Sequence, residues 1–262
     1  MRVIPWEDLV ARRTAVEQPV HLTIGVFDGL HLGHRRLIES IGKGLPRCLP
    51  TVVTFSDAPA RALAPHAFPG TILTFRQKLE RLEGLDVRAA VVIDFSEEMS
   101  HLSGKAFVGL LKDNLAIEKI VVGYNFRFGK GRESGAGDLK EMLFDTGIEV
   151  QVTEPVRWRD QVVSSSRIRK TIQEADFSGA GSMLAARFEL DLRGVDARRE
   201  GDLLTVRRPA VPQVLPKEGA YRVSCTGPGW TGAGALTVGG DSLVLAAGGH
   251  GEISTITFHH SE

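Results

Sequence analysis

One stretch of the chain decides the fold: Thr23-Ile-Gly-Val-Phe-Asp-Gly-Leu-His-Leu-Gly-His34, continued by Arg35-Arg-Leu-Ile-Glu-Ser-Ile41. An apolar run of strand type gives way to glycines and histidines, and a pattern of helical period then begins. A strand, a tight turn and a helix start, in this order, present unpaired backbone N–H groups to an anion. The stretch therefore predicts a phosphate site.

The glycines and histidines of this turn suit a bound phosphate. Gly25, Gly29 and Gly33 carry no Cβ and leave room for a phosphate to approach the backbone. His31 and His34 are three residues apart, so they share a face if both lie in the first helical turn. The turn is neither a Walker loop nor the dinucleotide fingerprint. A zinc site at these histidines lacks further ligands at suitable spacing, and neither Cys48 nor His66 fits.

Composition limits the other possibilities. The 262 residues allow one large domain or two unequal ones, and the formal net charge of +0 gives no global argument for nucleic acid or an anionic membrane. No apolar run reaches the length of a membrane span, and the first residues do not resemble a secretory signal. Cys48 and Cys225 are interpreted as buried small hydrophobes. We expect a cytoplasmic protein with small-molecule ligands and no nucleic-acid or membrane partner; its oligomeric state stays open.

Strands and helices are expected to alternate from residue 20 onward. The expected strands are 22–27, 49–55, 89–95, 119–123 and 148–152, and the expected helices include 34–41, 75–85 with Thr74 as N-cap, and one capped by Ser103. Residues 56–70 are expected to form a loop. Continuous apolar strands alternating with amphipathic helices are typical of a doubly wound parallel sheet, and ligands bind beyond the carboxyl ends of its strands.

The pattern changes after residue 188. Short alternating runs separated by Gly, Pro and Asp turns predict a small all-β domain. The boundary is expected near Leu184, which gives an α/β domain over residues 1–184 and a β domain over residues 185–262.

A second candidate anion site is Ser164-Ser165-Ser166-x-Ile168-Arg169. Hydroxyl groups and free N–H groups at a helix start, with an arginine one turn in, form an anion clamp. Read alone, the serines are explained equally well by ordinary N-capping.

The HxGH turn, joined to this later S-S-x-x-I-R helix start, resembles the nucleotidyltransferase superfamily that joins a phosphate monoester to a nucleoside triphosphate. Within it, Gly123-Tyr-Asn-Phe-Arg-Phe-Gly129 resembles the flavin-nucleotide loop, G-x-[DN]-F-x-F-G, of bacterial FAD synthetases. The resemblance covers about residues 20–190. It implies a Rossmann-like α/β domain followed by a barrel-like β domain.

The resemblance also implies a reaction, in which AMP passes from ATP to FMN to give FAD and pyrophosphate, with Mg²⁺ carried by ATP and no metal site on the protein. The implied catalytic residues are His31, His34 and Arg169. The implied ATP-binding residues are Gly25, Phe27, Asp28, Gly29, Gly33, Ser164, Ser165 and Ser166. The implied flavin-binding residues are Pro59, Asn125, Phe126, Arg127 and Phe128.

Two segments depart from the family pattern. The family's Phe-x-Pro-His-Pro segment is Phe55-Ser-Asp-Ala-Pro59 here, so only Phe55 and Pro59 match. Most members continue into a riboflavin kinase with a G-x-P-T-A-N motif and a catalytic glutamate in the context E-x-H-[LI]-x-D-F. Pro216-Lys-Glu-Gly-Ala-Tyr221 resembles the kinase's P-x-G-x-Y turn, but the other two features are missing from the sequence. We therefore predict that kinase activity is absent.

Three alternatives remain open. A bifunctional riboflavin kinase and FAD synthetase requires that other residues replace the missing phosphate loop. The second alternative is another HxGH nucleotidyltransferase that acts on nicotinamide mononucleotide, phosphopantetheine or glycerol phosphate. It does not explain the Asn125–Gly129 loop. A non-enzymatic flavin-nucleotide-binding module is the third. Core packing explains Phe126 and Phe128 as readily as flavin contact does, and Asp28 caps the turn as readily as it orients His31.

Overall fold

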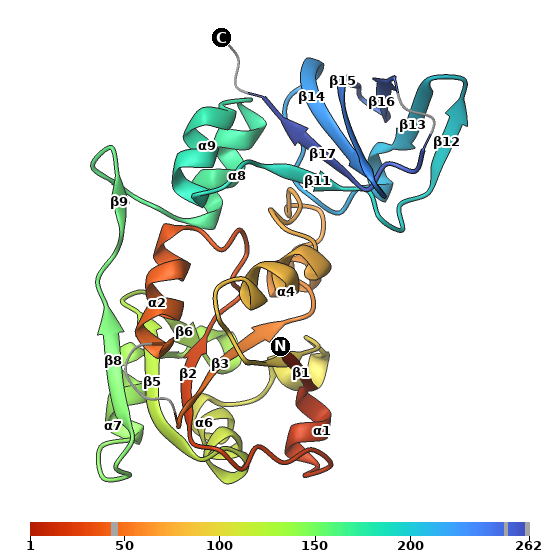
Figure 1. Ribbon diagram of the computed structural model, residues 1–262. Helices are drawn as coiled ribbons and strands as arrows, with labels where there is room; N and C mark the ends of the chain where they lie inside the picture. The colour runs from red at the N-terminus through yellow and green to blue at the C-terminus, as the bar shows by residue number, and fades with distance from the viewer. Residues whose placement is uncertain (43–46, 249–250, 260–262) are drawn as a thin grey trace. The chain divides into compact units, whose positions relative to one another are not determined.

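The computed structural model describes residues 1–42, 47–248 and 251–259 (Figure 1). The chain forms two compact units: unit 1 consists of Met1–His66 and Lys78–Val162, and unit 2 consists of Ala67–Gln77 and Val163–Glu262. Within the described ranges, no helix is both long and apolar enough to cross a membrane.

Unit 1 is built on a six-stranded parallel sheet, as predicted, with strand order β1-β4-β3-β2-β5-β8. Every residue of β2 and β4 is buried, because helices cover both faces of the sheet. The strands are β1 (Arg2–Pro5), β2 (Val20–Ile24), β3 (Leu49–Phe55), β4 (Ala89–Ile93), β5 (Ile117–Gly123) and β8 (Glu149–Thr153). The edge strand β1 was not predicted, since four residues are too few to show a period.

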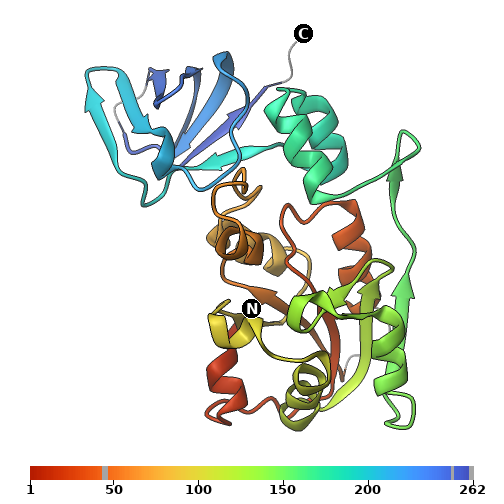
Figure 2. The same cartoon turned by 180° about the vertical axis from the view of Figure 1, so that it is seen from behind.

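Helices lie on both sides of this sheet (Figure 1, Figure 2). Apolar side chains of α1, α6 and α7 share one core cluster with the sheet, whereas α2 packs against β2, β3 and β5. The predicted caps are confirmed, since the Ser103 hydroxyl accepts from the Ala106 N–H and the Thr74 hydroxyl from the Gln77 N–H. The helices that begin in unit 1 are α1 (Trp6–Val10), α2 (Leu32–Gly42), α3 (Pro59–Leu63), α5 (Glu97–Ser100), α6 (Gly104–Asn114) and α7 (Ala136–Met142), and α4 (Phe75–Glu83) runs from unit 2 into unit 1.

Residues 56–70 were wrongly expected to be loop throughout. The short helix α3 begins at Pro59, whose fixed φ suits the first turn of a helix. Smaller elements follow β5 and β8: the hairpin β6 (Arg127–Phe128) and β7 (Ser134–Gly135), with the 3₁₀ turn η1 (Lys130–Arg132) between them, and the hairpin β9 (Arg157–Trp158) and β10 (Gln161–Val162).

Unit 2 holds the predicted second sheet, a half-barrel of seven antiparallel strands in the order β11-β17-β14-β15-β16-β13-β12. Its strands are β11 (Glu189–Asp191), β12 (Ala197–Glu200), β13 (Leu203–Arg207), β14 (Gly219–Gly227), β15 (Trp230–Val238), β16 (Ser242–Ala247) and β17 (Thr255–Phe258), with the 3₁₀ turn η2 (Arg208–Ala210) after β13. The helices α8 (Ser165–Gln173) and α9 (Phe177–Leu184) precede the sheet.

An aromatic cluster joins α9 to this sheet. The ring of Phe177 stacks on Phe258 at 4.4 Å and meets Tyr221 edge-on at 5.7 Å, and Phe188 stacks on Phe258 at 5.6 Å. The contacts therefore group α8 and α9 with the β sheet and divide the chain at Val163, whereas the predicted boundary near Leu184 follows the change in sequence pattern.

A buried glutamine explains why residues 67–77 belong to unit 2. The Gln213 amide donates to the carbonyl oxygens of Ile72 and Glu189, each at 2.8 Å, and its oxygen accepts from the Asp191 N–H at 2.7 Å. Gln213 is 2% exposed, so these bonds lie out of water, where an unmade one is costly.

We expect Phe177→Ala to lower the free energy of unfolding by about 3–5 kcal/mol, because it removes the centre of a packed aromatic cluster. Urea denaturation measures the change. Phe144→Ala is the matched control: Phe144 is 84% exposed, so its loss should change the value by less than about 0.5 kcal/mol. Equal effects of the two substitutions would contradict the packing described for α9.

Candidate active site

The turn between β2 and α2 has a strained backbone. Phe27 and Leu30 have φ of 53° and 45°, and Gly29 has 88°, all in the left-handed region. For a non-glycine residue this conformation persists only when the surroundings impose it. Phe27 and Leu30 are 0% and 1% exposed, so burial of their side chains imposes it here.

The glycines of the turn make room for neighbouring aromatic rings. A Cβ on Gly25 would lie 3.3 Å from the Phe27 ring, and a Cβ on Gly33 would lie 3.1 Å from the His31 imidazole. Only Gly29 of the three has a positive φ. Gly25 and Gly33 therefore have a packing role that the sequence did not predict.

The two histidines are stacked on each other at the start of α2. Their ring centroids are 3.7 Å apart with an interplanar angle of 15°, so they share a face as expected. The His34 N–H donates to Nδ1 of His31 at 3.3 Å, which places the proton of neutral His31 on Nε2. The His34 Nδ1 atom is buried and has no hydrogen-bond partner among the residues that the structure describes. The edge of Phe27 meets the His34 ring at 5.2 Å.

Burial makes both imidazoles poor bases. Desolvation lowers the pKa of His31 from 6.5 to about 4. The pKa of His34 lies well below 6.5 because of desolvation first, and then because of the like charges of His31 and Lys78. At pH 7 in the absence of a ligand, both rings are neutral and act as hydrogen-bonding groups rather than cations.

Lys78 is a buried charged residue beside the histidine turn that was not among the predicted site residues. Its ammonium donates to the carbonyl oxygens of Phe55 at 2.6 Å and Val26 at 3.3 Å, at the carboxyl ends of β3 and β2. Burial lowers its pKa from 10.5 to about 8, although the carboxylates of Asp28 and Asp57 oppose the shift. Asp28 is 4% exposed, so the turn holds a buried carboxylate in the field of a buried ammonium. The stretch from Leu73 to Leu79 resembles the family in sequence, but that resemblance did not indicate where the Lys78 ammonium lies.

The predicted flavin loop follows β5, the neighbour of β2 in the sheet. Phe128 is 8% exposed and packs 6.2 Å from Phe107, and Phe126 stacks on Phe128 at 5.1 Å. Phe128 therefore packs in the core and the partly buried Phe126 packs against it, while Asn125 and Arg127 are exposed.

The predicted flavin residue Pro59 starts α3 and is partly buried. The segment before it, which departs from the family pattern, carries its own contacts: the Asp57 carboxylate accepts from the Ala58 N–H at 2.7 Å and lies 3.2 Å from the Arg61 guanidinium. The loops after β2, β3 and β5 begin at one edge of the sheet, as expected from the parallel order.

The serine cluster starts α8 in unit 2. The Ser164 hydroxyl caps the helix by accepting from the Arg167 N–H at 3.3 Å, and Ser165 and Ser166 form the first turn. The Arg169 Nε donates to the Gly70 oxygen at 3.0 Å, and its guanidinium lies 5.3 Å from the centre of the Phe68 ring. The sequence did not indicate these partners of Arg169, because they lie about 100 residues away along the chain.

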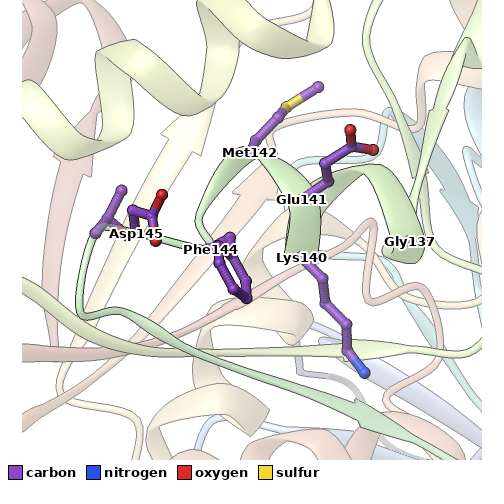
Figure 3. A pocket seen from close by; sticks show the side chains of 7 residues that line it. Gly137, Lys140, Glu141, Met142, Phe144 and Asp145 are labelled. Atoms are coloured by element: carbon purple, nitrogen blue, oxygen red, sulfur yellow. The ribbon is translucent and has the colours of Figure 1, made fainter.

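A hollow beside α7 is separate from all of these residues. It has a volume of about 590 Å³, and Figure 3 shows the side chains around it. Its lining residues are Gly137, Lys140, Glu141, Met142, Phe144, Asp145 and Thr146, none of which is a predicted site residue.

The histidine turn should make stability depend on pH. His31 has a pKa of 6.5 in the unfolded chain but about 4 in the folded chain, so the unfolded chain binds its proton first as pH falls. Protonation of His31 should therefore lower the free energy of unfolding by up to about 3 kcal/mol as pH falls from 6.5 to 4. Urea denaturation of His31→Gln should show a shallower pH dependence than wild type. His66→Gln, at an exposed position, should keep the wild-type dependence. An unchanged slope in His31→Gln would show that His31 is not the group responsible.

Comparison with known proteins shows which family the chain resembles in sequence. The FAD synthetase family profile matches residues 13–167. The bifunctional riboflavin kinase/FMN adenylyltransferase of Escherichia coli K12 is 30% identical over 214 residues, which cover 79% of this chain and 68% of that protein. The protein of the same name from Pseudomonas fluorescens is 27% identical over 246 residues, which cover 90% of this chain and 78% of that one.

A solved structure shares the fold. The crystal structure of a macrolide-efflux protein from Streptococcus pneumoniae matches with a TM-score of 0.82 and 22% identity, over 100% of this chain and 91% of that one. The residues that the family profile matches include the histidine turn and the flavin loop. The chain belongs to the FAD synthetase family.

Proposed function

We propose that the protein transfers AMP from ATP to FMN. An oxygen of the FMN phosphate attacks the α-phosphorus of ATP, the bond to the β-phosphate breaks, and FAD and pyrophosphate are formed. The attacking oxygen is already anionic, so the reaction needs no general base; it needs positioning and stabilisation of charge. The observation that carries this proposal is the stacked pair of neutral imidazoles at the start of α2, in a chain of the FAD synthetase family.

His31 and His34 are proposed to donate hydrogen bonds to the triphosphate. Because Nδ1 of His31 accepts from the His34 N–H, its Nε2–H is the donor left to face a ligand. The buried Nδ1 of His34 supports a second contact, since an unpaired buried polar atom is costly unless a ligand satisfies it. Backbone N–H groups from Phe27 to Gly29 and at the start of α2 add to the anion site, as the helix dipole favours.

Arg169 is proposed to neutralise the departing β- and γ-phosphates, with Ser164, Ser165 and Ser166 as further hydrogen-bonding groups. The support is the α8 helix start itself, where hydroxyl groups and N–H groups gather one turn before a guanidinium. The family profile ends at residue 167, so it includes this helix start.

FMN is proposed to bind at the loop after β5. The exposed Asn125 and Arg127 offer polar contacts, and the stacked Phe126 and Phe128 hold the loop in shape. Pro59 at the start of α3 is proposed to border the flavin.

Mg²⁺ is proposed to arrive bound to the ATP phosphates. The histidine turn offers imidazoles and N–H groups rather than the oxygen ligands that Mg²⁺ prefers, and its one buried carboxylate, Asp28, lies in the field of Lys78. When bound, the ion neutralises phosphate charge, and the residues of the turn orient the triphosphate. ATP and FMN are intracellular metabolites, so we propose that the enzyme acts in the cytoplasm.

His34→Ala and Arg169→Ala should each lower the turnover of FAD formation by about 10²–10³, since each removes a donor aimed at developing charge. Chromatography of FAD formed from FMN and Mg-ATP measures the rate. His66→Ala, at an exposed histidine outside the turn, should retain wild-type turnover. Near wild-type rates in both site variants would overturn the assignment, and AMP transfer to nicotinamide mononucleotide, phosphopantetheine or glycerol phosphate in place of FMN would identify a different nucleotidyltransferase.

We also propose that the protein does not phosphorylate riboflavin. The support is the sequence of unit 2, which lacks the G-x-P-T-A-N motif and the context of the kinase glutamate. Riboflavin with Mg-ATP should therefore give no FMN under conditions in which FMN with Mg-ATP gives FAD. Chromatography distinguishes the three flavins, and robust FMN production from riboflavin would show a bifunctional enzyme.

A further inference from the structure

Three metal-binding side chains converge at the opposite edge of the unit 1 sheet from the histidine turn. His21 lies at the start of β2, Cys48 immediately precedes β3, and Glu118 lies at the start of β5. These are the amino ends of three adjacent parallel strands, whereas the histidine turn follows the carboxyl end of β2. We propose that His21, Cys48 and Glu118 bind a Zn²⁺ ion.

The distances suit one ion. Glu118 Oε2 lies 3.1 Å from Cys48 Sγ and 4.0 Å from His21 Nε2, and all three ligand atoms lie within 4.8 Å of one another. Around a tetrahedral zinc ion with ordinary bond lengths, ligand atoms are about 3.3–3.6 Å apart. Small rotations of the side chains therefore bring the three atoms to zinc-binding distance.

The chemistry of the ligands favours zinc over harder ions. Thiolate, imidazole and carboxylate are the zinc ligands of proteins, whereas Mg²⁺ and Ca²⁺ select oxygen alone. Metal binding replaces the proton of the Cys48 thiol, and this proton is released to solvent. The Glu118 side chain is 39% exposed, which leaves a side of the site open for a water as fourth ligand.

The backbone holds these residues in place. The pairing of β2 with β5 shifts between Val20 and His21, because Val20 pairs with Ile117 but His21 with Lys119. Glu118 is thus the extra residue of a bulge, a device that redirects a side chain out of the alternation of a strand. His21 and Cys48 are 6% and 8% exposed, so packing fixes both of them.

Arg47 lies beside the Glu118 carboxylate. Its guanidinium is 4.0 Å from Oε1 of Glu118, whereas the other oxygen, Oε2, lies nearer the thiol and the imidazole. In the metal-free protein, the Cys48 thiol donates a hydrogen bond to the Glu118 carboxylate. The His21 Nε2 atom lies 4.0 Å from Glu118 Oε2, which is too far for a hydrogen bond.

Titration of the reduced, full-length protein with Co²⁺ tests the proposal, because cobalt bound to a thiolate gives a charge-transfer absorption band that histidines alone do not give. The wild type should show the band at one cobalt per chain, and Zn²⁺ should abolish it by displacement. Cys225→Ala, at the other buried cysteine, should keep the band, and Cys48→Ser should lose it. Glu118→Gln, at a partly exposed residue, should weaken metal affinity at least about tenfold.

Thermal unfolding gives a second readout that is independent of FAD synthesis. Zn²⁺ should raise the melting temperature of the wild type and of Cys225→Ala, but not that of Cys48→Ser, because a ligand that binds only the folded state stabilises it. Absence of the thiolate band from the wild type, its persistence in Cys48→Ser, or unchanged affinity in Glu118→Gln would overturn the proposal. Chelation should leave FAD formation in excess Mg²⁺ intact, so a failed zinc site and a failed synthetase assignment are distinguished.

Discussion

The histidine turn depends on the burial of Phe27. This side chain is 0% exposed, and its backbone takes a left-handed conformation that costs on the order of 1–3 kcal/mol in an L-residue. The ring fills the space above Gly25 and meets His34 edge-on, so the residue that strains the turn also supports a site histidine. Lys78 secures the adjoining strand ends through Val26 and Phe55. Buried apolar packing and the hydrogen bonds of Lys78 thus hold the histidine turn together.

Unit 2 includes segments that lie within the residues matched by the family profile. The family profile covers residues 13–167, yet residues 67–77 and the start of α8 group with the β sheet of unit 2. The amide of Gln213 bonds the first of these segments to β11, and Arg169 in α8 donates to Gly70 within the same segment. Arg169, the arginine that the family resemblance implies as catalytic, is therefore held by contacts within unit 2.

Local signals in the sequence predicted most elements. The strand at 49–55 matches β3 in both bounds, and Ser103, Thr74 and Ser164 cap helices as expected, since a cap and an apolar run depend on neighbouring residues. Non-local contacts were not predictable in this way. The four residues of β1 form a strand only because β4 offers an edge, and the place of residues 67–77 depends on Gln213, about 140 residues away.

The same distinction applies to the site. The pattern HxGH predicts two imidazoles on one face, and the structure adds that they stack and that Gly33 makes room for His31. The positions of Lys78 and the partners of Arg169 depend on tertiary packing that no spacing in the sequence encodes. The sequence of the loop is compatible with either role for its phenylalanines, and the structure shows Phe128 in the core with Phe126 packed against it.

Neutral imidazoles suit the proposed role of the histidine turn as a triphosphate site. Two buried cations beside each other would repel and would incur a large desolvation cost in the free protein, so the ligand-free turn keeps both rings uncharged. An anion that arrives at the turn favours the protonated forms and raises the pKa values toward the ordinary range. In the proposed complex with a triphosphate, positive charge at the histidines would develop only when the anion is bound, so the ligand-free protein would not have to hold that charge in its interior. Burial of the two histidines lowers their pKa values, and a bound anion would raise them again.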